Sequence, residues 1–153
     1  MSDSNEAQRI KEILLVDDDD ALRRLLCVMI EQMGFRPTSA RSGIDALEIL
    51  DREGTGAFHA LVTDIRMPRM TGLELAQAVR ARRPAMPILF ISGYAPSPDS
   101  LEDQLDEYSE FLKKPFSFDG FSSALENLLA LSNSGKNPPN PARKAGVSSQ
   151  AIV

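Results

Sequence analysis

Polar side chains that could hold a metal ion and a phosphoryl group follow four apolar segments of this 153-residue chain. Two carboxylates follow the first segment, and a carboxylate, a hydroxyl and an amine follow the others: Asp17, Asp18, Asp64, Ser92 and Lys114. If the segments are parallel strands, these groups gather at one edge of the sheet. Converging carboxylates repel one another unless a cation offsets their charge, and oxygen ligands with open positions suit Mg²⁺. The pattern therefore predicts a site for a divalent cation and a phosphoryl group.

The elements that must position these groups are five strands that alternate with five helices. The predicted strands are Ile13 to Val16, Phe35 to Ala40 (a weak strand broken by Pro37), Phe58 to Thr63, Ile88 to Ile91 and Phe111 to Lys113. The predicted helices are Ala21 to Met33, one that opens at Ser42-Gly43, Leu73 to Arg82, a short one from about Ser100 to Leu105, and Ser117 to Leu131. Strands that are apolar at every position are typical of parallel sheets covered on both faces. With right-handed crossovers, this alternation predicts an α/β fold with a doubly wound parallel sheet.

Each polar group also has a simpler interpretation on its own. In the run Asp17 to Asp20, Asp19 or Asp20 is expected to be an ordinary helix cap. Asp64 could shape a turn, and Ser92-Gly93 is a common exit from a strand to a loop. The metal and phosphoryl hypothesis therefore depends on the conjunction of the groups and on their order along the chain.

Other polar residues are not expected to join the site. His59 is the single histidine, and no second histidine or cysteine lies near it in the sequence, so we do not expect it to bind a metal ion. We place it at the start of the third strand, remote from the acidic edge. Arg80, Arg82 and Arg83 are expected to be a solvated helix end, where the helix dipole favours cations.

The composition is that of a globular protein with an acidic balance. The chain is 42% hydrophobic and 25% charged, with a net charge of -5. An acidic domain matches nucleic acid poorly, so cations and proteins are the expected partners. The polar N-terminus is not a signal peptide, no apolar stretch is long enough to span a membrane, and the single cysteine fits a reducing compartment. We expect a cytoplasmic protein that binds neither nucleic acid nor membrane.

The polar ends of the chain are expected to be disordered. Residues 1–10 carry little apolar surface, and residues 132–153 are rich in Ser, Asn, Gly and Pro. Such compositions cannot bury enough apolar surface to offset the entropy lost on ordering. One folded domain is therefore expected over residues 11–131.

Over that range the chain resembles the receiver domain of two-component response regulators. The resemblance depends on these motifs: Ile13-Leu14-Leu15-Val16-Asp17-Asp18, Thr63-Asp64-Ile65-Arg66-Met67-Pro68 with Thr71-Gly72, Ser92-Gly93, and Lys114-Pro115-Phe116. It implies a flavodoxin-like sheet with the strand order 2-1-3-4-5, flanked by five helices. It also implies a phosphorelay switch that catalyses only its own phosphorylation and dephosphorylation, rather than a metabolic enzyme.

The resemblance implies a role for each carboxylate of the predicted site. Asp64 would accept a phosphoryl group from the phosphohistidine of a sensor histidine kinase or of a histidine phosphotransfer protein. Asp18 and Asp64 would ligate Mg²⁺ directly, together with the backbone carbonyl of Arg66, while Asp17 would help through water. These roles amount to charge neutralisation and positioning, which supply most of what phosphoryl transfer needs.

The remaining implied roles belong to the phosphoryl-binding and switch residues. Ser92 would hydrogen-bond a phosphoryl oxygen, and Lys114 would pair with the phosphoryl charge. Phe111 stands where the family places a switch aromatic. Arg66 and Tyr94 stand where the family tunes the lifetime of the phosphoryl group.

The kind of regulator has several possible interpretations. Since no second domain follows residue 131, we expect a stand-alone receiver that acts by contact with an unknown downstream protein. The chain could instead be a receiver detached from a hybrid histidine kinase. A phosphatase of the haloacid-dehalogenase type is a third hypothesis, but it leaves Asp64 and Met67-Pro68 unexplained.

An acidic run beside the fifth strand is expected to select a basic partner. Its members are Asp99, Glu102, Asp103, Asp106, Glu107 and Glu110. A solvated helix face is the simpler interpretation of this run.

Overall fold

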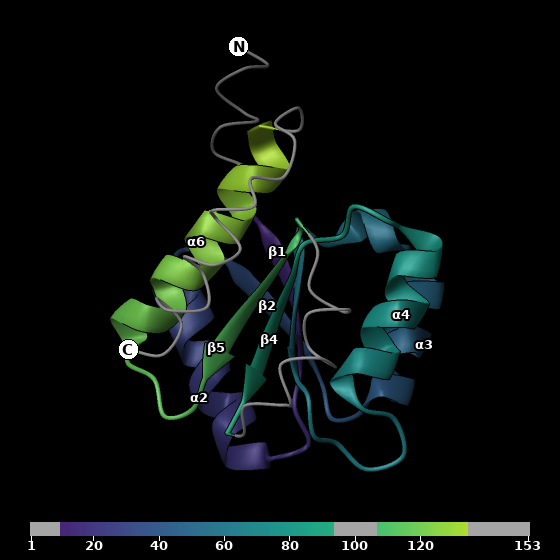
Figure 1. The fold of residues 1–153 in the computed structure, drawn as a ribbon, viewed down its shortest axis with the longest axis horizontal. Coiled ribbons are helices and arrows are strands. Elements are labelled where there is room, and N and C mark those ends of the chain that lie inside the picture. The colour runs from purple at the N-terminus through teal and green to yellow at the C-terminus, as the bar shows by residue number, and fades with distance from the viewer. Residues whose placement is uncertain (1–9, 94–106, 135–153) are drawn as a thin grey trace.

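A computed structural model describes residues 10–93 and 107–134 and shows a parallel sheet between two layers of helices (Figure 1). The strands are β1 (Glu12–Val16), β2 (Arg36–Ala40), β3 (Ala60–Asp64), β4 (Ile88–Ser92) and β5 (Ser109–Lys113). The helices are α2 (Asp20–Gln32), α3 (Gly43–Glu53), the 3-10 helix η1 (Thr55–Ala57), α4 (Gly72–Arg82) and α6 (Phe118–Ser134). All strand pairs are parallel, in the order β2-β1-β3-β4-β5. The doubly wound α/β fold and its strand order are thus confirmed.

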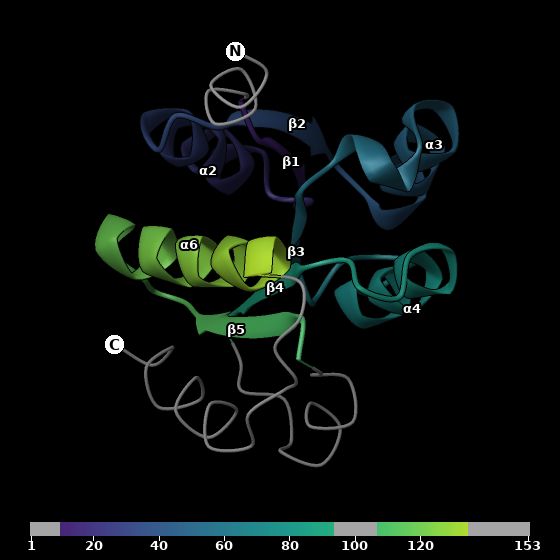
Figure 2. The same cartoon turned by 90° about the horizontal axis from the view of Figure 1, so that it is seen from above.

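The two faces of the sheet bury two separate apolar clusters. Helices α2 and α6 cover one face and α3 and α4 the other (Figure 2). Side chains alternate along β1, so that Ile13 and Leu15 join the cluster of α2 and α6, while Leu14 and Val16 join that of α3 and α4. Strands β3 and β4 are buried at every position. Burial on both faces accounts for the continuous apolar runs in the sequence.

The helices that flank the acidic edge begin with side-chain caps. The Asp19 carboxylate accepts hydrogen bonds from the N–H groups of Ala21 and Leu22, at 3.0 and 3.1 Å. The expected helix cap is therefore Asp19, and Asp20 is the first residue of α2. Helix α4 begins with a reciprocal capping box between Thr71 and Glu74. These caps fix where the chain leaves the sheet edge and enters each helix.

The prediction that Pro37 breaks the second strand was wrong. Strand β2 runs through Pro37 and pairs with β1 along its whole length. The Arg36 N–H donates to the Lys11 carbonyl, and the Ala40 carbonyl accepts from Asp17 N–H. Because bonding alternates along a strand, Pro37 points its backbone away from β1, at the outer side of an edge strand. A proline is tolerated there because no partner strand needs its missing donor.

The interpretation of the arginines of α4 as a solvated helix end was also wrong for two of them. Arg80 Nη2 donates to the carbonyls of Met86 and Tyr108 and to Ser109 Oγ, at 3.2, 3.3 and 2.7 Å. Arg83 Nη1 donates to the carbonyls of Thr55 and Phe58, at 3.1 and 2.7 Å. Arg82 is exposed and forms an ion pair with Asp51. The end of α4 is therefore held to the start of β5 and to the segments before β3 and β4, contacts that the local sequence pattern does not reveal.

His59 lies at the amino end of the sheet, as predicted. It precedes β3 directly, and its Nδ1 accepts a hydrogen bond of 2.9 Å from the N–H of Glu12, the first residue of β1. The acidic residues Asp17 and Asp64 stand at the opposite ends of the same two strands. His59 is thus remote from the candidate site.

Some predicted boundaries differ from the observed ones. Strand β5 begins at Ser109 rather than Phe111, because Ser109 pairs with Ile88 of β4. Helix α6 continues past Leu131 to Ser134, so the helix includes the first three residues of the expected disordered tail. The predicted short helix from Ser100 to Leu105 lies outside the described residues, as do most of both predicted disordered ends. No helix in residues 10–93 and 107–134 has the length and apolar character that crossing a membrane requires.

Candidate metal and phosphoryl site

Three carboxylates meet at the carboxyl edge of the sheet. Asp17 and Asp18 follow β1, and Asp64 ends the adjacent β3, where Val16 pairs with Thr63. One carboxylate oxygen from each acid lies within 4.8 Å of the others. Asp17 and Asp64 are 1% and 8% exposed, whereas Asp18 faces solvent. An all-oxygen donor set that is open to solvent on one side fits Mg²⁺, which keeps several of its waters.

The electrostatics of the cluster favour a cation. Burial raises the pKa of Asp17 to about 6, against the lowering effect of the Asp19 N–H, and the nearby carboxylate of Asp64 adds to the rise. Burial also raises the pKa of Asp64, although Lys114 and the backbone N–H groups of Arg66 and Ile65 act in the opposite direction. Carboxylates that are both desolvated and close together are stabilised in their charged form by an added positive charge.

Lys114 and Ser92 complete the edge next to Asp64. Lys114 Nζ lies 3.3 Å from Asp64 Oδ2. The backbone N–H of Lys114 donates to the Ser92 carbonyl at 2.8 Å, because β4 and β5 pair up to Ser92 and Lys113. Ser92 is buried, at 2% exposed. The structure therefore brings the hydroxyl, the amine and the three carboxylates of the sequence prediction to one edge.

The backbone around Asp64 is packed closely against the start of α4. The Gly72 N–H donates to the Ile65 carbonyl at 2.8 Å, and a Cβ at Gly72 would clash with the Asp64 carbonyl. The buried hydroxyl of Thr63 donates to the same Asp64 carbonyl at 2.9 Å. The loop between β3 and α4 thus has little freedom to move away from Asp64.

The other predicted site residues differ in their surroundings. Phe111 is buried, at 7% exposed, in the apolar cluster of α3 and α4. The side chain of Arg66 is exposed, and Tyr94 lies outside the described residues. Glu110, which we expected on an exposed acidic face, is 4% exposed because its strand is covered, so that expectation was wrong for Glu110. Glu107 is half-buried, and the other acids of the run lie outside the described residues.

Sequence reasoning missed Arg23, which contacts the acidic run. Its Nη1 donates to the Asp17 carbonyl at 2.8 Å and its Nη2 to Asp20 Oδ1 at 2.6 Å. The hydrogen bond and charge of Arg23 lower the pKa of Asp20. One signal was present in the sequence: a cation near the start of a helix, where the helix dipole favours anions, suggests a compensating acid.

Comparison with known proteins identifies the family of this chain. The response regulator receiver domain family matches residues 13–126. The chain is 34% identical over 120 residues to the response regulator receiver protein CpdR of Brucella abortus (strain 2308), which covers 78% of this chain and 98% of that protein. It is 33% identical over 117 residues to the sensor kinase CckA of the same strain, which covers 76% of this chain but 12% of the kinase. The crystal structure of a response regulator receiver protein from Sinorhizobium medicae WSM419 has a TM-score of 0.71 and 32% identity, over 80% of this chain and 96% of that one.

The chain belongs to the response regulator receiver domain family, the receivers of two-component signalling. The resemblance seen in its motifs is thereby confirmed. The family match favours a receiver over the phosphatase hypothesis, because it extends over β1 to α6 and includes Asp64 with Met67-Pro68.

Proposed function

We propose that this chain is a phosphorylation-dependent switch in which Asp64 accepts a phosphoryl group. One observation carries the proposal: the Asp64 carboxylate lies among two further carboxylates and 3.3 Å from Lys114 Nζ. The donor would be the phosphohistidine of a sensor histidine kinase or of a histidine phosphotransfer protein. The similarity to CpdR and to a segment of CckA supports a place in two-component signalling.

The proposed step is a direct transfer between two side chains. A carboxylate oxygen of Asp64 attacks phosphorus, the new P–O bond forms, and the P–N bond to the donor imidazole breaks. The imidazole leaves with the electron pair of that bond and takes up a proton. Lys114 pairs with the transferred charge, and the Ser92 hydroxyl donates to a phosphoryl oxygen. Positioning and charge stabilisation of this kind provide most of the rate in phosphoryl transfer.

Asp18 and Asp64, with the backbone carbonyl of Arg66, would hold Mg²⁺, while Asp17 would contact it through water. When bound, the ion offsets the negative charge that gathers at the phosphoryl oxygens. We propose that the phosphorylated receiver then acts by contact with a downstream protein, with Phe111 as the switch aromatic and with Arg66 and Tyr94 tuning the phosphoryl lifetime. A free receiver and a receiver from a hybrid kinase would share this chemistry. In either case it would catalyse only its own phosphorylation and dephosphorylation.

The direct test is labelling with a small-molecule phosphodonor and Mg²⁺. The protein should gain one phosphoryl group that is stable in acid and labile in base, and Asp64→Asn should gain none, because the amide cannot act as the acceptor. Asp119→Asn is the matched control, since Asp119 is an exposed acid in the first turn of α6, and it should label as the wild type does. Stoichiometric labelling of the Asp64→Asn variant would refute the proposal.

A further inference from the structure

Asp17 is held in place at three of its atoms. Its N–H donates to the Ala40 carbonyl at 3.2 Å. Its Oδ1 accepts from the Asp19 N–H at 2.9 Å, and its carbonyl accepts from Arg23 Nη1 at 2.8 Å. The first two partners are backbone groups that any sequence could supply, but the third is a side chain. Of the three contacts, the one at the backbone carbonyl of Asp17 therefore depends on the identity of residue 23.

The guanidinium of Arg23 bridges Asp17 and Asp20, the two ends of the turn Asp17 to Asp20, which we call the acidic turn. While Nη1 contacts the Asp17 carbonyl, Nη2 contacts the Asp20 carboxylate at 2.6 Å. The Arg23 side chain is 14% exposed, which limits its freedom to turn away. The planar fork of an arginine can make two such contacts at fixed spacing, which a lysine cannot do. Asp18, between the two contact points, is thereby held at the edge of the sheet.

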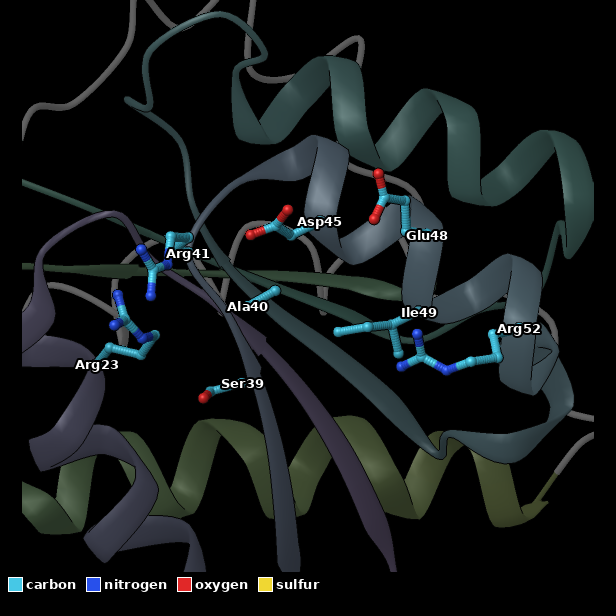
Figure 3. Close-up of a pocket in the computed structure, with 8 residues that line it drawn as sticks. All are labelled: Arg23, Ser39, Ala40, Arg41, Asp45, Glu48, Ile49 and Arg52. Carbon is cyan, nitrogen blue, oxygen red and sulfur yellow. The ribbon is translucent and has the colours of Figure 1, made fainter.

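The outer side of Arg23 lines an open groove of about 240 Å³ between α2, β2 and α3 (Figure 3). Arg41 and Asp45 line the same groove, and Arg41 lies next to Arg23 in this view. Arg24, the next residue along α2, is exposed and lies within electrostatic reach of Asp20. Arg23, Arg24 and Arg41 thus all lie close to the acidic turn. Among the described contacts, Arg23 is the arginine that donates to the Asp17 carbonyl.

We infer that Arg23 is a positioning residue for the metal site: it holds the turn from Asp17 to Asp20 so that Asp17 and Asp18 keep the spacing a divalent cation requires. The inference depends on the proposed function, because the cation belongs to that function. Positioning and simple charge have opposite consequences for metal binding. A nearby positive charge repels Mg²⁺, so its removal alone would tighten binding, whereas loss of a group that orients a ligand weakens binding, by about 10-fold or more.

The test compares Mg²⁺ affinity, measured by calorimetric titration, in Arg23→Met and in the matched control Arg24→Met. Both variants lose one positive charge on neighbouring residues of the same helix, and methionine keeps a similar helix propensity. We expect the dissociation constant for Mg²⁺ to rise by about 10-fold in Arg23→Met. In Arg24→Met it should stay the same or fall. Equal affinity in the two variants would overturn the inference.

Arg23→Lys separates geometry from charge and also decides the matter if Arg23→Met does not fold. It keeps the positive charge but loses the fork, so we expect it to bind Mg²⁺ more weakly than the wild type. Wild-type affinity in Arg23→Lys would show that charge alone suffices and would overturn the inference.

Phosphorylation provides the second readout. At saturating Mg²⁺, Arg23→Met should label Asp64 to the wild-type level, because only the affinity for the ion is reduced. Persistent loss at saturating Mg²⁺ would show that Arg23 acts on another step. If the wild-type protein itself failed to bind Mg²⁺, the proposed function would fail first, and this inference with it.

Discussion

Asp64 is fixed through both its side chain and its backbone. The carboxylate faces Lys114 and the two other acids, while the carbonyl accepts from Thr63 and packs against Gly72. A phosphoacceptor gains from such restraint, because transfer requires the attacking oxygen to be aligned with the donor. Residues that touch only the backbone of Asp64 should therefore affect the site.

Gly72→Ala tests this restraint. A methyl group at residue 72 has no space beside the Asp64 carbonyl, so the loop or α4 must shift. Overpacking of this kind typically costs about 1–3 kcal/mol. We expect a lower free energy of unfolding, measured in urea, together with weaker Mg²⁺ binding.

Gly56→Ala is the control for Gly72→Ala. A Cβ at Gly56 would meet no atom within 4 Å, and its backbone does not have the positive φ that favours glycine. This control should leave Mg²⁺ binding unchanged and stability unchanged or slightly increased. If Gly72→Ala behaved in the same way, the close packing against Asp64 would have no energetic consequence.

At this scale the sequence predicted the main chemical groups but not their supports. Asp17, Asp18, Asp64 and Lys114 were predictable because the ends of parallel strands share one edge of a sheet. The contact of Arg23 was not, since it depends on the conformation of the turn and on one rotamer. The Thr63 hydroxyl was missed for the same reason: its acceptor is a neighbouring carbonyl whose direction only the fold defines.

At the scale of elements, the carboxyl and amino ends of β1 and β3 carry different groups. Their carboxyl ends carry the acidic cluster, whereas their amino ends are joined by His59. The backbone N–H of His59 donates to the Glu12 carbonyl, and its side-chain Nδ1 accepts from the backbone N–H of Glu12. Because Nδ1 accepts this hydrogen bond, it carries no proton, so the imidazole is neutral in the folded state. Burial, and then the positive charge of Lys11, lower the pKa of His59.

This lowered pKa predicts a loss of stability in acid. Above about pH 6.5, the ordinary pKa of histidine, His59 is neutral in both states and its contribution is complete. As the pH falls through that value toward the lower folded pKa, the unfolded chain binds a proton that the native chain does not, so stability decreases. Asp17, whose pKa is raised to about 6, acts in the opposite direction over this range. The decrease is therefore measured as the difference in free energy of unfolding between wild type and His59→Asn, in urea between pH 8 and pH 5.

His59→Asn and His59→Leu check that the decrease comes from this residue. Asparagine can place an oxygen where Nδ1 stands and does not titrate, so the Asn variant should lack this part of the pH dependence. Leucine leaves the Glu12 N–H without its acceptor and should lower stability by about 1 kcal/mol above about pH 6.5. This deficit should shrink in acid, because the wild type then loses the contribution of His59. If the difference between wild type and His59→Asn did not change with pH, the prediction would be wrong.

At the scale of the whole molecule, the fold could be predicted from the alternation of apolar runs with helical patterns. The strand order followed from the family resemblance rather than from the pattern. What could not be predicted depends on distant contacts. Arg80 bonds to groups around Ser109, and Arg83 to the loop before β3, so neither is a free helix end. Pro37 is tolerated because β2 is an edge strand, a property of the sheet and not of the segment.

The arrangement at the sheet edge should deliver the phosphoryl group to one carboxylate, that of Asp64. Reduction of the phosphorylated protein with borohydride converts an aspartyl phosphate to homoserine, and peptide mass spectrometry then locates the change. We predict homoserine at position 64 and at no other aspartate, with none formed when the phosphodonor is omitted. Homoserine at Asp17 or Asp18, or a labelled protein without any homoserine, would contradict the assignment of Asp64 as the acceptor.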